Sequence, residues 1–116
     1  MIVGVPKEIK EDETRVGLLP VGVRGALVEA GHDVYFEQES GIGAGVSDEA
    51  YMEEGAIVVD TAEEVFAQAE VILKVKEPQP EEVARLTPEH TLFTYLHLAA
   101  EQSLTQGLMD SGATCI

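Results

Sequence analysis

Three ionisable side chains stand where apolar segments of the sequence end. Lys76 closes residues 71–76 (VILKVK), His97 closes residues 91–97 (TLFTYLH), and Arg15 lies in a long polar loop after the first apolar segment. An arginine can bind a carboxylate through two parallel hydrogen bonds, and a lysine can hold a second anionic or carbonyl oxygen. A histidine can donate to a carbonyl or exchange a proton near neutral pH. Together these residue types predict a pocket for a small carboxylate with an adjacent carbonyl or amine.

Short β-branched segments alternate with helical patterns, and these elements must position the three side chains. Strands are predicted at residues 2–5, 33–37, 57–59, 71–75, 91–96 and 114–116, and helices at residues 21–29, 47–54, from Thr61, 80–86 and 99–109. Strands separated by helices of about ten residues pair in parallel through right-handed crossovers. The predicted fold is therefore α/β: a doubly wound, mostly parallel sheet with helices on both faces, Rossmann-like or flavodoxin-like.

Arg15, Lys76 and His97 all follow predicted strand ends. In an open parallel sheet, ligands bind beyond the carboxyl ends of the strands, so we expect the three side chains at one edge. Taken singly, each has a plainer interpretation. Arg15 could form a surface ion pair with neighbouring acids, either Lys74 or Lys76 could be a solvated strand end, and His97 could be structural. Their coincidence at one edge favours the pocket.

Charge and composition exclude several classes of partner. Seven basic residues stand against 22 acidic ones, and the formal net charge of -15 would repel nucleic acids and anionic membranes. The lone cysteine, Cys115, excludes a disulfide framework and a cysteine-based zinc site, and we expect it to be buried. No signal peptide or membrane-spanning run is visible, which is typical of a soluble cytoplasmic protein. At 116 residues the chain is one domain, small for a complete two-substrate enzyme.

Two further features have plainer explanations than function. Residues 41–45 (GIGAG) follow a strand and precede a helix, but Val46 stands where a dinucleotide fingerprint needs a small residue. The segment is therefore predicted to be a tight glycine turn, with no cofactor bound here. His32 and His90 follow turns and are predicted to be exposed.

Three stretches carry a family resemblance: residues 1–16, which contain MIVGVPKE and ETRV, residues 73–78 (LKVKEP), and residues 92–100 (LFTYLHLAA). They resemble the N-terminal region of alanine dehydrogenase, and the likeness runs over all 116 residues. The opening stretch also resembles the proton-translocating transhydrogenase alpha subunit and the saccharopine dehydrogenase relatives.

The resemblance implies NAD-dependent oxidative deamination of L-alanine to pyruvate and ammonia, and the reverse amination. Carried over by motif, Arg15 and Lys76 hold the substrate carboxylate. His97 hydrogen-bonds the carbonyl oxygen of pyruvate, or the corresponding atom of the carbinolamine intermediate, and Tyr95 lines the same pocket. Lys76 and His97 are the implied catalytic residues.

The resemblance also implies that substrate and cofactor bind to different domains of a longer chain. Residues 1–116 would be the N-terminal catalytic, substrate-binding segment, and the nucleotide-binding domain that holds NAD would lie outside this sequence. The chain ends inside a predicted strand, which indicates a fragment, and we expect that fragment alone to be inactive. A homo-oligomer, often a hexamer, is typical of the family. Glu8 and Glu13 match the motif without an assigned role, and Lys74 is interpreted as a structural neighbour.

Other functions stay open at this point. One is the soluble nucleotide-binding component of an NAD(P) transhydrogenase, and another is a relative of carboxyethylornithine synthase or saccharopine dehydrogenase. A third is a non-enzymatic acidic domain that binds small carboxylates or a protein partner. The KVKEP and LHLAA stretches around Lys76 and His97 favour the dehydrogenase over the transhydrogenase, which has no amino acid to hold.

Overall fold

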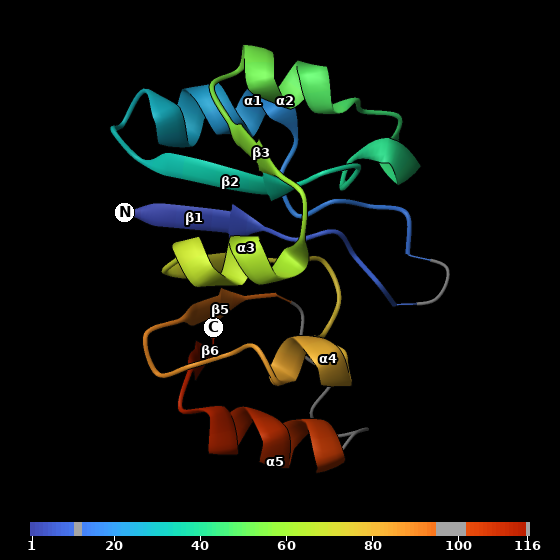
Figure 1. The fold of residues 1–116 in the computed structure, drawn as a ribbon, viewed down its shortest axis with the longest axis vertical. Helices are drawn as coiled ribbons and strands as arrows, with labels where there is room; N and C mark the ends of the chain where they lie inside the picture. The colour runs from blue at the N-terminus through green and yellow to red at the C-terminus, as the bar shows by residue number, and fades with distance from the viewer. Residues whose placement is uncertain (11–12, 95–101, 116) are drawn as a thin grey trace.

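Strands and helices alternate in residues 1–10, 13–94 and 102–115, which the computed structural model describes (Figure 1). Short elements dominate, as the frequent proline and glycine punctuation predicts. The elements are β1 (Ile2–Val5), α1 (Pro20–Gly22), the π-helix η1 (Val23–Val28), β2 (Asp33–Glu37), the 3-10 helix η2 (Ile42–Ala44), α2 (Asp48–Glu53), β3 (Ile57–Val59), α3 (Ala62–Gln68), β4 (Val71–Leu73), α4 (Pro80–Val83), β5 (Thr91–Phe93), α5 (Gln102–Ser111) and β6 (Thr114–Cys115).

The strands form one sheet in the order β3-β2-β1-β4-β5-β6. Every described strand pair is parallel, with registers such as Val3 opposite Val34 and Ile72 opposite Leu92. The strand order runs one way from β1 to β3 and the other way from β4 to β6, so it reverses between β1 and β4. The doubly wound parallel α/β fold predicted from the sequence is confirmed.

Helices pack on both faces of this sheet. Ile72 of β4 belongs to one buried cluster, whereas its neighbours Val71 and Leu73 pack against the other. Because successive strand residues point to opposite faces, the two clusters mark the two faces. Val23 of η1 joins the first cluster and Phe66 of α3 joins the second, and Figure 1 shows α3 in front of the sheet with α1 and η1 behind it.

Side-chain caps start two helices where the sequence predicts them. The Ser47 hydroxyl accepts from the Ala50 amide at 3.3 Å, and the Thr61 hydroxyl accepts from the Glu64 amide at 3.2 Å. Each bond satisfies one of the amides that the first turn of a helix leaves without a partner. Gly55 follows α2 with φ at 97°, a conformation that favours glycine.

The predicted strand at residues 71–75 is too long, since β4 ends at Leu73. The Lys74 amide still donates to the Phe93 carbonyl at 3.1 Å. The next two amides donate to the carboxylate of Glu8 instead of to a neighbouring strand. A side chain therefore replaces the sheet as hydrogen-bond acceptor, and the ladder stops there.

Other boundaries differ from the prediction by a few residues. The predicted helix at residues 80–86 ends at Val83, and the predicted helix at residues 21–29 begins at Pro20 and continues with π-helical hydrogen bonding. The described part of the predicted strand at residues 91–96 ends at Phe93. Boundaries of this kind depend on cap geometry more than on hydrophobic pattern.

Three burial predictions need correction. His90 is buried, not exposed: its Nδ1 accepts from the Thr87 amide at 3.0 Å, and its Nε2 lies 2.7 Å from the Phe66 carbonyl oxygen. One ring nitrogen therefore accepts and the other donates, which is the pattern of the neutral imidazole. Cys115 is exposed, not buried, and His32 is half-buried. None of the helices in the described ranges is long and apolar enough to cross a membrane.

Candidate functional site

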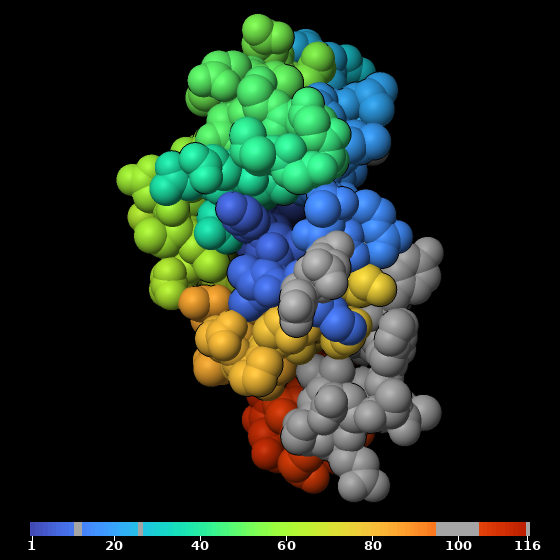
Figure 2. Space-filling view, turned by 90° about the vertical axis from the view of Figure 1, so that its right-hand side faces the viewer, coloured from blue at the N-terminus to red at the C-terminus, as the bar shows by residue number. Residues whose placement is uncertain are grey.

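The loops that follow β1 and β4 meet at the carboxyl edge of the sheet. Glu8 comes three residues after β1, and Lys74 directly follows β4. The strand order reverses between these two strands, and doubly wound sheets bind ligands at that point. Figure 2 shows this edge, with the blue atoms of the segment after β1 beside the yellow atoms of the segment after β4.

Gly17 allows the loop that carries Arg15 to pass over the end of β4. A Cβ atom on Gly17 would lie 2.7 Å from the carbonyl oxygen of Leu73, which is closer than a carbon and an oxygen can approach. Only glycine permits this contact without a shift of the backbone. The close approach brings the Arg15 loop next to the segment that begins at Lys74.

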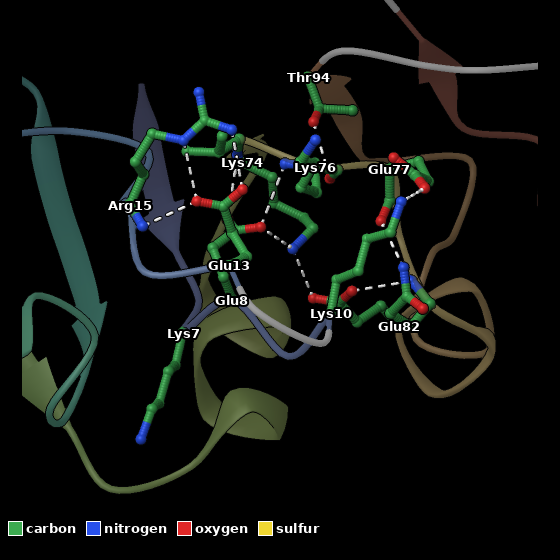
Figure 3. A network of polar contacts seen from close by, with 12 residues as sticks. Lys7, Glu8, Lys10, Glu13, Arg15, Lys74, Lys76, Glu77, Glu82 and Thr94 are labelled. Carbon is green, nitrogen blue, oxygen red and sulfur yellow. Dashed lines mark hydrogen bonds and ion pairs between the residues drawn. The ribbon is translucent and has the colours of Figure 1, made fainter. Parts of the chain in front are cut away.

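A buried ion cluster fills the point where the loops meet (Figure 3). The Lys74 ammonium lies 3.0 Å from Oε1 of Glu8 and 2.9 Å from Oε2 of Glu82. The side chain of Lys74 is 1% exposed, and both carboxylates are 2% exposed. Burying charges is unfavourable unless they are paired and hydrogen-bonded, so this lysine is not a solvated strand end.

The cluster has two carboxylates for one ammonium, and backbone amides help to stabilise the excess negative charge. Glu8 accepts from the amide of Val75 at 3.0 Å and from the amide of Lys76 at 3.2 Å. Glu82, at the start of α4, accepts from the amide of Gln79 at 2.9 Å. Hydrogen bonds from amides to an ionised carboxylate are stronger than those between neutral groups. The cluster therefore stabilises both the start of α4 and the backbone next to Lys76.

Arg15 pairs with Glu13 at the outer side of the cluster. Its Nε and Nη2 atoms each donate to a Glu13 carboxylate oxygen at 2.9 Å, and the Arg15 amide donates to the same carboxylate at 2.8 Å. The Arg15 side chain is 64% exposed. The arrangement includes the ion pair that the plainer interpretation of Arg15 predicts, and it also fixes the plane of the guanidinium.

The positive charge of Lys76 also influences the pKa of Glu13, the carboxylate that pairs with Arg15. The hydrogen bonds from Arg15 lower the pKa of Glu13 to about 2, and the positive charge of Lys76 contributes a smaller part of the shift. An ionised carboxylate near two cations is stabilised in its charged form. Arg15 therefore contacts the Glu13 carboxylate directly, and the charge of Lys76 contributes only weakly to its ionised state.

A second group of contacts surrounds Lys76. The hydroxyl of Thr94 donates to the Lys76 carbonyl at 2.9 Å, and Lys10 pairs with Glu77. The side chain of Lys7 points away from the network in Figure 3. Five of the seven basic residues of the chain are nevertheless gathered at this edge: Lys7, Lys10, Arg15, Lys74 and Lys76.

The structure brings together two of the four predicted site residues. Arg15 and Lys76 lie at the same edge, and Arg15 hydrogen-bonds the Glu13 carboxylate. Tyr95 and His97 lie outside the described residues. No group of three or more histidine, cysteine, aspartate and glutamate side chains in the described ranges could hold a metal ion.

Sequence reasoning missed the roles of the carboxylates around these cations. The motif gives Glu8 and Glu13 no role, and neither composition nor strand position points to Glu82. A signal for Glu82 was available: it lies three residues after Gln79 with Pro80 between them, the spacing of a capping box with proline at the first helical position. No local signal links Glu8 to Lys74, because 66 positions separate them.

The glycine-rich loop contributes to packing. A Cβ on Gly43 would lie 2.8 Å from the carbonyl oxygen of Thr14, so this loop packs directly on the loop that carries Arg15. Gly45 has φ at 81° and ends the turn. The prediction of a tight turn is confirmed.

A neighbouring hollow is a poorer carboxylate site than the cation pair. It measures about 350 Å³ and lies beside α3 and α4. Its ionisable lining is mostly acidic: Glu37, Asp60, Glu63, Glu81 and Glu82, with Lys7 and Arg85. Burial raises the pKa of Glu37 above its usual value. Like charges would repel a carboxylate there, so Arg15 and Lys76 are the better candidates for binding one.

The parallel sheet and the cations at its switch point define a doubly wound α/β domain with a candidate anion site at its carboxyl edge. Residues 4–116 match the family model described as "Alanine dehydrogenase/PNT, N-terminal domain". The chain belongs to this family.

Relatives named alanine dehydrogenase align over the whole chain. The chain is 58% identical to the one from Halomonas elongata and 50% identical to the one from Methanococcus maripaludis, and it covers 31% of each. The Bacillus subtilis relative is 49% identical, and 30% of it is covered. The chain thus spans about a third of the length of the curated relatives it matches.

Solved structures show the same arrangement. An L-alanine dehydrogenase superposes with a TM-score of 0.95 at 52% identity, over 100% of this chain and 32% of that one. A transhydrogenase from Sinorhizobium meliloti superposes with a TM-score of 0.91 at 28% identity, over 99% of this chain and 34% of that one. Both known proteins therefore contain a segment with this fold.

Proposed function

We propose that residues 1–116 are the substrate-binding segment of an NAD-dependent L-alanine dehydrogenase. The reaction would be the reversible conversion of L-alanine, NAD and water to pyruvate, ammonia and NADH. Family membership and the relatives named alanine dehydrogenase support this proposal. As in the family, we expect a homo-oligomer acting in the cytoplasm on a small-molecule substrate.

One observation carries the assignment of the site: Arg15 already holds a carboxylate, that of Glu13, through two parallel hydrogen bonds, and Lys76 lies at the same edge of the sheet. The carboxylate of L-alanine or pyruvate carries the same charge and the same acceptor geometry. Arg15 and Lys76 would hold it as two cations around one anion, with the planar arginine fixing its orientation. The α-carbon would then be presented in one orientation, and such positioning is a major part of what a protein adds to cofactor chemistry.

His97 and Tyr95 complete the proposed pocket. His97 would donate to the carbonyl oxygen of pyruvate, or to the corresponding oxygen of the carbinolamine, and a histidine can exchange a proton there near neutral pH. Tyr95 would line the pocket. Thr94, the last described residue before them, donates to the carbonyl of Lys76.

NAD is proposed to bind outside this chain. The glycine loop has Val46 where a dinucleotide fingerprint needs a small residue, and acidic residues stand nearby in the sequence. The cofactor would supply the hydride acceptor, and the residues of this chain would bind and orient the substrate. The segment alone would therefore bind a carboxylate without turning it over.

Steady-state kinetics of the protein that carries this chain would test the proposal. We expect NAD-dependent oxidation of L-alanine, and we expect Lys76→Ala and His97→Ala each to reduce kcat/KM by about 100-fold or more. Arg85→Ala is a matched control, because it removes a cation that pairs with Glu63 on a different part of the surface. Absence of L-alanine oxidation in the wild type, or full activity of Lys76→Ala, would contradict the proposal.

A transhydrogenase component is the second candidate, since the Sinorhizobium meliloti transhydrogenase shares the fold at 28% identity. Hydride transfer between NADH and an oxidised NADP analogue, with no dependence on L-alanine, would favour it. The cations at the carboxyl edge favour the dehydrogenase. A carboxyethylornithine synthase or saccharopine dehydrogenase activity would instead require a second amino acid together with the keto acid.

A further inference from the structure

We propose that Glu8 is a positioning residue for Lys76: its buried carboxylate fixes the backbone that presents the lysine to the substrate carboxylate. The proposal deepens the function assigned above and rests on it for the role of Lys76. Glu8 lies next to the proposed site but is not one of the residues proposed to bind the substrate carboxylate.

The amides of Val75 and Lys76 depend on Glu8, whereas the Lys76 carbonyl is held by the hydroxyl of Thr94 at 2.9 Å. The last ladder hydrogen bond of β4 is donated by the Lys74 amide to Phe93. Beyond that point, the amides of Val75 and Lys76 both donate to Glu8, at 3.0 and 3.2 Å. One carboxylate therefore provides the acceptors that β5 provides to the residues before it.

The carboxylate of Glu8 is itself fixed. Its side chain is 2% exposed, and its Oε1 lies 3.0 Å from the ammonium of Lys74, which is 1% exposed. Glu8 also follows Pro6, which is buried at the end of β1. A carboxylate can only accept hydrogen bonds, so it suits a position that faces two amides and an ammonium. Glutamine would place an NH₂ donor against one of those donors.

Glu82 provides a matched control for Glu8. Its side chain is also 2% exposed, it pairs with the same ammonium at 2.9 Å, and it also accepts from a backbone amide, that of Gln79. Its amide partner belongs to the start of α4, not to the segment that carries Lys76. Neutralising either carboxylate leaves Lys74 with one anion, so the charge balance of the cluster changes equally in the two variants.

The experiment compares Glu8→Gln with Glu82→Gln in the full-length protein that carries this chain. Three measurements are made on each: KM and kcat for pyruvate in reductive amination, hydrogen exchange at the amides of Val75 and Lys76, and the free energy of unfolding. We expect Glu8→Gln to raise KM for pyruvate about tenfold and to speed exchange at both amides, since small misplacements of a binding group have large effects. Glu82→Gln is expected to leave KM for pyruvate and the exchange rates of these amides within about twofold of the wild type. Similar unfolding free energies in the two variants would separate positioning from general destabilisation.

The possible outcomes distinguish the inference from the proposed function. Equal changes of KM in both variants, or unchanged exchange at Val75 and Lys76 in Glu8→Gln, would overturn the positioning role. A wild-type protein that does not act on pyruvate would overturn the proposed function, and with it the part of the inference that concerns substrate. If Glu8→Gln does not fold, Glu8→Asp replaces it, because the shorter side chain keeps the charge and withdraws the acceptor from the amides. The same exchange and KM criteria then apply.

Discussion

Lys74 and Lys76 are two residues apart in the sequence and lie in opposite environments. The first is 1% exposed and contacts two carboxylates, and the second is half-buried, and its charge contributes only slightly to the lowered pKa of Glu13. The inner lysine neutralises acids that the fold has buried. The outer one keeps part of its side chain exposed, and we propose that it binds the substrate carboxylate.

The contrast shows how position decides what a cation does in an acid-rich chain. A buried ion pair stabilises a fold little compared with apolar packing, but removing one partner leaves an uncompensated charge. An exposed pair is screened by water and salt and adds little stability. Residues of the first kind should therefore affect folding, and residues of the second kind should affect binding. Four predictions test this division.

Lys74→Met should have the largest effect, on stability. The substitution leaves the carboxylates of Glu8 and Glu82 buried together without their cation, and we expect a loss of about 3–5 kcal/mol in the free energy of unfolding. Urea or guanidinium denaturation measures it. Lys76→Met is the control and should lose less than about 1 kcal/mol. Equal losses in the two variants would abolish the distinction between the lysines.

Lys76→Met should have its effect on catalysis instead. Under the proposed function, it removes one of the two cations that hold the substrate carboxylate, and we expect kcat/KM to fall about 100-fold, or roughly 2.7 kcal/mol. Circular dichroism and thermal unfolding should match the wild type. Kinetics close to wild type would contradict the proposal that Lys76 binds the substrate carboxylate.

Arg15→Lys should weaken pyruvate binding more modestly. Lysine keeps the charge but cannot reproduce two parallel hydrogen bonds, so we expect KM for pyruvate to rise about three- to tenfold. Arg24→Lys, on a different exposed pair with Glu54, serves as the control and should leave KM unchanged. An unchanged KM in Arg15→Lys would show that the planar guanidinium is not needed.

Glu13→Gln should give the smallest effect: a small loss of stability at neutral pH that disappears in acid. The pKa of Glu13 is lowered to about 2, mainly by the hydrogen bonds from Arg15, below the ordinary value of 4.5. A lowered carboxyl pKa contributes stability that is present above the unfolded-state pKa and is lost as pH falls from about 4.5 towards 2. The variant should lose less stability than the wild type over that interval, measured by thermal unfolding against pH. Added salt should reduce the difference, since Arg15 is exposed.

Much of the fold follows from the sequence. Alternating β-branched and helical segments predict a parallel sheet, and cap residues such as Ser47 and Thr61 mark helix starts correctly. The end of β4 was missed because local pattern alone cannot show that Glu8, far away in sequence, will take the amides of Val75 and Lys76. His90 was misjudged for the same reason, since its partner Phe66 lies 24 positions away.

The candidate site was predictable in its cations and not in its anions. Lys76 and Arg15 stand out because basic residues are scarce in this chain and follow strand ends. Glutamates are common here, so Glu8 and Glu82 carry no compositional signal, and only the folded geometry shows that both contact Lys74. The opposite inner and outer roles of the two lysines likewise depend on where the strand stops.

The gathering of basic residues at one edge also affects how fast a small anion reaches the protein. Eight ionisable residues of the network (Glu8, Lys10, Glu13, Arg15, Lys74, Lys76, Glu77 and Glu82) comprise four bases and four acids, so their formal charges cancel and the rest of the chain carries the whole net charge of -15. An approaching carboxylate is therefore expected to be repelled over most of the surface and least near this edge. At 0.1 M salt the interaction between charges decays over about 10 Å, so salt weakens the distant repulsion more than the contact itself. Moderate salt should consequently speed the encounter, the reverse of what is found when a charged surface attracts its ligand.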